Sequence, residues 1–163
     1  MIAIIDYDAG NTFNVQKALQ HIGLDAVLTA DRDTILAADG VILPGVGAYA
    51  SAVSVLRERG LIEVIHKVVE RNIPLLGICL GMQLLFDESE EYGSTAGLGI
   101  IPGNVKAIPN NLGLRVPHMG WNQNKLCRKD SVFSDVADKY TYFVHSYYVD
   151  TNSQYSHCQH RCK

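Results

Sequence analysis

The stretch from Pro74 to Gly81 reads Pro-Leu-Leu-Gly-Ile-Cys-Leu-Gly, a short apolar run that ends in a G-x-C-x-G turn. A continuous apolar run of this length is typical of a strand buried on both faces of a parallel sheet. A helical pattern follows from about Leu80 to Asp87. The order of strand, turn and helix predicts an α/β fold with Cys79 at the carboxyl end of a strand.

The segments before this stretch alternate between the same two patterns. Strand-like runs occupy residues 2–5, 26–28 and 41–43, and helical spacing lies between them and from 50 to 69, with a break expected at Gly60. After Gly93 the pattern changes to short extended pieces at 105–108, 114–116 and 142–149. The sequence therefore predicts a doubly wound, mostly parallel sheet flanked by helices, followed by a more antiparallel second half.

Length and composition favour one cytoplasmic globular domain. The chain has 163 residues, a net charge of −3 and 14 Lys and Arg residues without a basic run, which gives no sign of nucleic acid or an anionic membrane surface as a partner. The N-terminal Met-Ile-Ala-Ile-Ile-Asp lacks the basic region of a signal peptide, and no apolar run is long enough to cross a membrane. We expect the four cysteines to be reduced thiols.

Cys79 is the candidate nucleophile. A turn between a strand and a helix holds such a residue in a strained conformation, and glycines two positions away on each side let neighbouring backbone approach. Unpaired N–H groups and the helix dipole favour a thiolate there, and the Leu80 N–H can donate to an oxyanion. The alternative is a buried structural cysteine with glycines for packing.

Other polar and glycine-rich segments leave two interpretations open. The Pro44–Gly47 loop follows a strand and is either a second source of oxyanion donors or a structural turn. His145 closes a strand-like run and suits substrate binding or a structural role equally well. The tail 156–163 holds two cysteines and two histidines, but zinc sites usually add a distant second pair, so we expect no metal site.

These motifs together resemble the class I (triad-type) glutamine amidotransferases, whose nucleophile motif matches residues 77–83. Within that class the chain is most similar to the family of glutaminase subunits of imidazole glycerol phosphate synthase. The similarity lies in residues 4–11, 44–49 and 117–122 and in Met82, and it extends from Met1 to about Tyr155. Asp8 and Asn14 stand where that family usually has glycine and serine.

The resemblance implies the class I glutamine amidotransferase fold, no cofactor, and glutamine hydrolysis through a thioester on Cys79. It implies that ammonia passes to a (β/α)8-barrel cyclase subunit, in a heterodimer that serves histidine biosynthesis. By position, the oxyanion donors are the amides of Val46 and Leu80. The implied glutamine pocket is Gly47, Gln83, Glu91, His145, Ser146 and Tyr147, and the implied partner interface is Pro117, His118, Met119, Gly120, Trp121 and Asn122.

The family completes its triad with a His-Pro-Glu segment, and no His-x-Glu occurs in this sequence. We therefore expect an incomplete domain over 1–155, truncated or frameshifted after about Tyr155, with the C-terminal strands and the catalytic His/Glu segment missing and a non-homologous tail over 156–163. The alternative to a glutaminase subunit is a catalytically dead product that retains only the partner-binding face. Other members of the class, such as anthranilate amidotransferases, are disfavoured by residues 117–122 and Met82.

Overall fold

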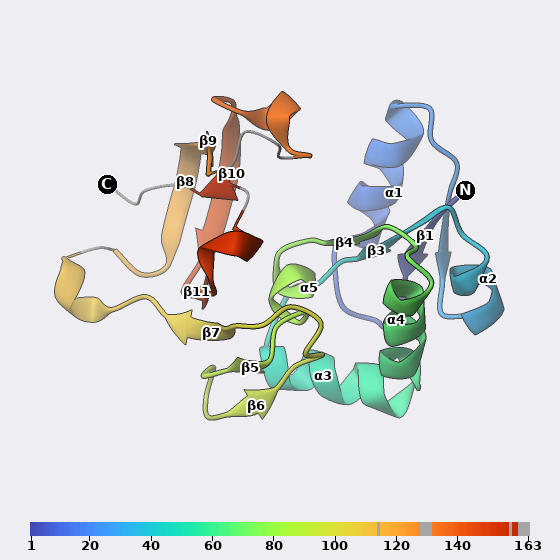
Figure 1. Cartoon of the computed structure of the whole chain (residues 1–163), viewed down its shortest axis with the longest axis horizontal. Helices are drawn as coiled ribbons and strands as arrows, with labels where there is room; N and C mark the ends of the chain where they lie inside the picture. The colour runs from blue at the N-terminus through green and yellow to red at the C-terminus, as the bar shows by residue number, and fades with distance from the viewer. Residues whose placement is uncertain (114, 128–131, 157, 160–163) are drawn as a thin grey trace. The chain divides into compact units, whose positions relative to one another are not determined.

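The computed structural model describes residues 1–113, 115–127, 132–156 and 158–159. The chain divides into two compact units, Met1–Ile101 and Pro102–Lys163. Figure 1 shows the chain coloured from its N-terminus to its C-terminus. That residues 1–155 form one domain remains a prediction.

The first unit is built on a parallel sheet, as the sequence predicts. Its strands are β1 (Ile2–Ile5), β2 (Ala26–Thr29), β3 (Gly40–Leu43) and β4 (Leu75–Gly77), in the order β2-β1-β3-β4. Ile2 pairs with both Ala26 and Gly40, and Val41 pairs with Leu75, all in parallel register. Because β1 and β3 lie inside the sheet, Ile4, Ile5 and Leu43 are buried in its core.

Helices follow the strands in alternation, and together with the sheet they confirm the predicted α/β fold (Figure 1). They are α1 (Thr12–His21), α2 (Arg32–Leu36), α3 (Tyr49–Glu58), α4 (Leu61–Glu70) and α5 (Leu80–Gln83). The predicted break at Gly60 is confirmed, because this residue adopts a left-handed φ of 66° between α3 and α4. The side chains of Asn11 and Asp31 cap α1 and α2 by accepting backbone N–H groups.

The helix after Cys79 is shorter than the sequence predicts. It ends at Gln83, whereas the apolar spacing indicates a helix to about Asp87. The carbonyl groups of Leu84, Leu85 and Phe86 accept hydrogen bonds from N–H groups of residues 98–101, and so they are not used to continue the helix. Backbone pairing with a distant segment has replaced the helical bonds that local periodicity predicts. The first unit also contains an antiparallel pair, β5 (Glu88–Ser89) and β6 (Thr95–Ala96).

The strand pairings described in the second unit are antiparallel, which confirms the change of pattern. Its strands are β7 (Asn104–Ala107), β8 (His118–Gln123), β9 (Lys125–Leu126), β10 (Tyr140–His145), β11 (Tyr147–Asp150) and β12 (Cys158–Gln159). They pair as β8 with β10, β7 with β11 and β9 with β12. Short 3₁₀ turns occupy Asn110–Leu112, Ser134–Val136 and Ser153–Tyr155.

Two predicted strands of this unit are wrong in detail. The run 142–149 is split at Ser146, because β10 and β11 pair with different strands. Of the predicted strand 114–116, Leu114 lies outside the described residues, and Arg115 and Val116 belong to no strand. Across the part of the chain that the structure describes, no helix combines the length and the apolar character that crossing a membrane requires.

Candidate active site

Cys79 occupies a strained backbone position directly between β4 and α5. Its φ of 55° and ψ of −118° lie in a region that side-chain-bearing residues rarely adopt, at a cost of roughly 1–3 kcal/mol. The thiol is free and exposed. A strained, exposed residue on a turn from a strand to a helix is the geometry that presents a nucleophile to a substrate. The predicted nucleophile position is therefore present in the structure.

The two flanking glycines are required because backbone contacts them closely. A Cβ atom on Gly77 would lie 2.5 Å from the Met82 Cα, and one on Gly81 would lie 1.9 Å from the Leu43 carbonyl oxygen. Both distances are shorter than real Cβ contacts. The turn that carries Cys79 is thus packed directly against the end of β3, to which it is also joined by a 3.0 Å hydrogen bond from the Ile78 N–H to the Leu43 carbonyl.

The Pro44–Gly47 loop lies against the first turn of α5. A Cβ atom on Gly45 would lie 2.6 Å from the Gly81 nitrogen and 3.0 Å from the Leu80 Cβ. Gly47 adopts a φ of 96°, and a Cβ atom at this position would meet nothing within 4 Å. The structure therefore brings the two predicted loops together, and glycine is needed at position 45 for close approach and at position 47 for its backbone conformation.

Tyr7, two residues after the end of β1, supports this loop and is a residue whose role the sequence does not reveal. Its side chain is fully buried, and its hydroxyl donates a 2.8 Å hydrogen bond to the Pro44 carbonyl. A Cβ atom on Gly45 would lie 2.8 Å from the same hydroxyl. Burial, with a smaller contribution from Cys79, raises the pKa of Tyr7 to about 12. The phenol is thus a neutral donor at physiological pH.

The candidate oxyanion donors are Val46 and Leu80. The N–H groups of Gly81, Met82 and Gln83 already donate to the carbonyls of Ile78 and Cys79. Within the described ranges, the N–H groups of Val46 and Leu80 donate to no protein acceptor. Because α5 is only one turn long, its dipole is small, and the favourable field for an anion comes from these N–H groups.

Three predicted glutamine-pocket residues lie in the same unit. Gly47 is in the loop beside α5, and Gln83 is half-buried at the end of α5. The Glu91 carboxylate accepts a 2.6 Å hydrogen bond from the Tyr49 N–H at the start of α3. Glu91 therefore anchors the helix that begins directly after the Pro44–Gly47 loop, in addition to any contact with a substrate.

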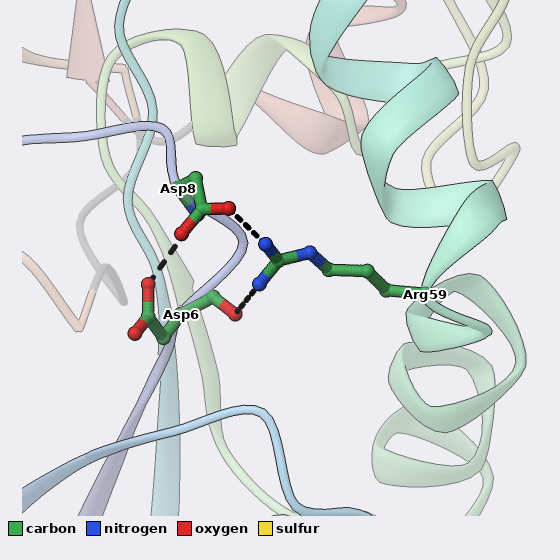
Figure 2. Close-up of polar contacts among 3 residues, drawn as sticks. All are labelled: Asp6, Asp8 and Arg59. Atoms are coloured by element: carbon green, nitrogen blue, oxygen red, sulfur yellow. Dashed lines mark hydrogen bonds and ion pairs between the residues drawn. The ribbon is translucent and has the colours of Figure 1, made fainter.

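A surface ion pair fixes the loop after β1. Arg59 pairs with the Asp8 carboxylate and donates a 3.4 Å hydrogen bond to the Asp6 carbonyl, while the Asp8 N–H donates to the Asp6 side chain (Figure 2). Asp8 has a φ of 63°, a left-handed backbone conformation that favours glycine. The ion pair holds an aspartate in a backbone conformation that suits glycine better.

The remaining predicted residues lie in the second unit. His145 ends β10, Ser146 forms the turn, and Tyr147 begins β11. The predicted interface segment consists of Pro117 and the first residues of β8: His118, Met119, Gly120, Trp121 and Asn122. Met119 and Trp121 are more than half exposed, while His118 and Asn122 are half-buried on the opposite face of the strand. The segment therefore has one exposed face and one half-buried face.

The tail residues that suggest a metal site are only partly described. His157, His160 and Cys162 lie outside the described residues, and Cys158 is described only as part of β12. Among the described residues, no group of three or more His, Cys, Asp or Glu side chains could hold a metal ion.

Comparison with known proteins identifies relatives of high sequence identity. The sequence profile of the family described as glutamine amidotransferase class-I matches residues 3–161. The "Imidazole glycerol phosphate synthase subunit HisH" of Lacticaseibacillus casei is 56% identical over 156 residues, which are 96% of this chain and 75% of that protein. The subunit of the same name from Streptococcus sanguinis is 50% identical over 155 residues, or 95% of this chain and 75% of that protein. The chain thus spans about three quarters of these relatives.

Solved structures with much lower identity share the fold. A structure described as "Crystal structure of glutamine amidotransferase" has a TM-score of 0.68 at 19% identity, over 88% of this chain and 71% of that one. The "Structure of PurLQS from Thermotoga maritima" has a TM-score of 0.67 at 18% identity, over 99% of this chain and 74% of that one. These similarities confirm the predicted α/β architecture.

Proposed function

This chain belongs to the class I glutamine amidotransferase family, and on that premise we propose that it is the glutaminase subunit of an imidazole glycerol phosphate synthase. Its reaction is the hydrolysis of glutamine to glutamate and ammonia for histidine biosynthesis. The observation that carries the proposal is Cys79, held at a φ of 55° on an exposed turn between two glycines that backbone contacts closely. The names of the relatives favour this enzyme over a protein that only binds the partner.

The proposed chemistry begins with attack of the Cys79 sulfur on the carboxamide carbon of the glutamine side chain. A carbon–sulfur bond forms, the carbon–nitrogen bond breaks, and the nitrogen leaves as ammonia with the proton that the thiol gives up. Water then attacks the thioester, which releases glutamate and restores the thiol. The oxyanion of each tetrahedral intermediate accepts hydrogen bonds from the Val46 and Leu80 N–H groups, which have no protein acceptor among the described residues.

By the resemblance to the family, substrate recognition is assigned to Gly47, Gln83, Glu91, His145, Ser146 and Tyr147.

The proposed partner is a (β/α)8-barrel cyclase subunit, which receives the ammonia in a cytoplasmic heterodimer. The name of the relatives, a synthase subunit, supports a partner. The exposed Met119 and Trp121 side chains on one face of β8 are the surface that we assign to this contact. An apolar, aromatic patch of this kind is typical of the centre of a protein interface.

The proposal is tested by alkylation of the 163-residue chain with iodoacetamide, with the modified cysteines quantified by mass spectrometry of peptides. We expect L-glutamine to slow alkylation of Cys79 and to leave Cys127, which is also free and exposed, unaffected. D-glutamine at the same concentration is the control for non-specific effects. Equal protection of both cysteines, or none at Cys79 at any L-glutamine concentration, would exclude a glutamine site at the turn.

A further inference from the structure

The proposed chemistry assigns no part to Tyr7, although its hydroxyl lies where the two segments that carry the oxyanion donors meet. The Tyr7 hydroxyl oxygen, the Gly81 nitrogen and the Leu80 Cβ all lie within 3.0 Å of the point that a Cβ atom on Gly45 would occupy. Gly45 precedes Val46, and Leu80 and Gly81 form the first turn of α5. The hydroxyl is therefore next to both segments.

The first half of the Pro44–Gly47 loop is held from two directions. The Tyr7 hydroxyl donates a 2.8 Å hydrogen bond to the Pro44 carbonyl, which belongs to the planar peptide that joins Pro44 to Gly45. Gly10 approaches the same peptide: a Cβ atom on Gly10 would lie 3.1 Å from the Pro44 Cβ and 3.4 Å from the Gly45 nitrogen. Because Tyr7 is fully buried, water does not compete for its hydrogen bond.

The second half of the loop is much less tightly packed. The Val46 side chain is more than half exposed, and a Cβ atom on Gly47 would meet nothing within 4 Å. The direction of the Val46 N–H is therefore decided by the residue before it. Gly45 has only two soft dihedral angles, and the Pro44 peptide from which they start is the one that Tyr7 holds.

Tyr7 acts on this site through the loop and not as an acid or base. Its one proton is committed to the Pro44 carbonyl. Burial raises the pKa of Tyr7 to about 12, so the phenol does not release this proton at neutral pH. Cys79 contributes to the same increase in pKa, which places the phenol within electrostatic reach of the thiol.

We propose that Tyr7 is a positioning residue for the oxyanion site: by holding the Pro44 carbonyl, its hydroxyl sets the direction of the Val46 N–H relative to the Leu80 N–H. Two donors stabilise an oxyanion together only when both point at the place where the charge develops. Tyr7 thus accelerates acyl transfer to Cys79, in addition to any effect on stability. The inference deepens the proposed function and rests on its assignment of the two donors.

The test separates acyl transfer, which develops an oxyanion, from alkylation, which does not. With p-nitrophenyl acetate, the Cys79 sulfur bonds to the acetyl carbon, p-nitrophenolate leaves, and the thiol proton passes to water. With iodoacetamide, the same sulfur displaces iodide from a saturated carbon. Both initial rates are measured on the full 163-residue chain by acid quenching and mass spectrometry of the peptides that contain Cys79 and the free Cys127.

The readout is the ratio of the acetylation rate to the alkylation rate at Cys79. We expect Tyr7→Phe to lower this ratio about tenfold and to leave the alkylation rate within about twofold, because the ring still fills its site but the donor is lost. Tyr92→Phe is the matched control, since the Tyr92 side chain is 93% exposed in the same unit, and its ratio should not change. The ratio at Cys127 should be the same in every variant.

A second substitution places 4-aminophenylalanine at position 7, which keeps the ring and a weaker donor, and its ratio should lie between those of Tyr7→Phe and the unchanged chain. An unchanged ratio in Tyr7→Phe, or an equal loss of both rates, would overturn the inference, because a purely structural role does not separate the two reactions. If circular dichroism shows that Tyr7→Phe does not fold, the 4-aminophenylalanine variant decides by the same criteria. Since p-nitrophenyl acetate is not glutamine, failure of L-glutamine to protect Cys79 would refute the proposed function and leave this test valid.

Discussion

The Tyr7 hydroxyl donates a 2.8 Å hydrogen bond to the Pro44 carbonyl, beneath the loop that carries one of the two candidate oxyanion donors. This bond links the segment after β1 to the loop after β3, against which the Cys79 turn is also packed. The position of the Val46 N–H relative to the thiol therefore depends on a buried side chain that contacts no solvent.

Tyr7→Phe should lower the free energy of unfolding by about 1–3 kcal/mol, because the ring still fills its site but the buried Pro44 carbonyl loses its donor. Urea denaturation measures the change. Tyr92→Phe is the matched control, since the Tyr92 side chain is 93% exposed, and it should have no effect. Equal stability of the two variants would mean that the hydroxyl does not support the loop.

Gly81→Ala should prevent the Cys79 turn from packing against the end of β3. The new Cβ would lie 1.9 Å from the Leu43 carbonyl oxygen, which belongs to rigid backbone and cannot move aside. We expect a loss of more than about 3 kcal/mol in the free energy of unfolding, or failure to fold. Gly23→Ala is the control: its φ is also positive, at 79°, but its Cβ meets nothing, and the cost should be near 1 kcal/mol. Similar costs for both variants would contradict the close packing of the turn.

Asp8→Gly should be neutral or stabilising by up to about 1 kcal/mol, because it relieves a left-handed backbone conformation while it removes only an exposed ion pair with Arg59. Asp8→Ala loses the same ion pair but keeps the strain, so it should be the less stable of the two. Thermal unfolding of both variants in low and high salt measures the difference. An Asp8→Gly variant that is less stable than the unchanged chain in low salt, by an amount that high salt removes, would show that the ion pair outweighs the backbone strain.

His118 should make stability depend on pH below about 6.5. Burial, followed by the effect of His145, lowers the pKa of His118 in the folded chain, while an unfolded histidine titrates near 6.5. The unfolded chain therefore binds a proton first as the pH falls, and the stabilisation present at neutral pH is lost as the pH drops through the folded pKa. Urea midpoints measured between pH 7.5 and 5.5 should fall less steeply for His118→Asn than for the unchanged chain. Parallel slopes would mean that His118 does not contribute.

The sequence predicts the fold of the first unit well because its signals are local. The apolar runs at 2–5 and 41–43 and the break at Gly60 each depend on a few neighbouring residues, and each is confirmed. The end of α5 could not be predicted, because it is decided by residues 98–101, which take the carbonyl groups that a longer helix would use.

The sequence could predict the candidate site only where its residues form a motif at consecutive positions. The G-x-C-x-G turn is such a motif, and it identifies Cys79. The role of Tyr7 depends on a contact with Pro44, 37 positions away, and the pairing of His118 with His145 depends on the register of two strands. Neither contact leaves a pattern in the local sequence, so both required the structure.

The most direct test of the account is to trap the acyl-enzyme. The 163-residue chain is incubated with L-glutamine, quenched in acid, digested, and searched by mass spectrometry for a γ-glutamyl group on its cysteines. We expect the group on Cys79, absent from Cys127 and absent throughout Cys79→Ala. An unmodified Cys79, or ammonia release that persists in Cys79→Ala, would contradict the assignment of Cys79 as the nucleophile.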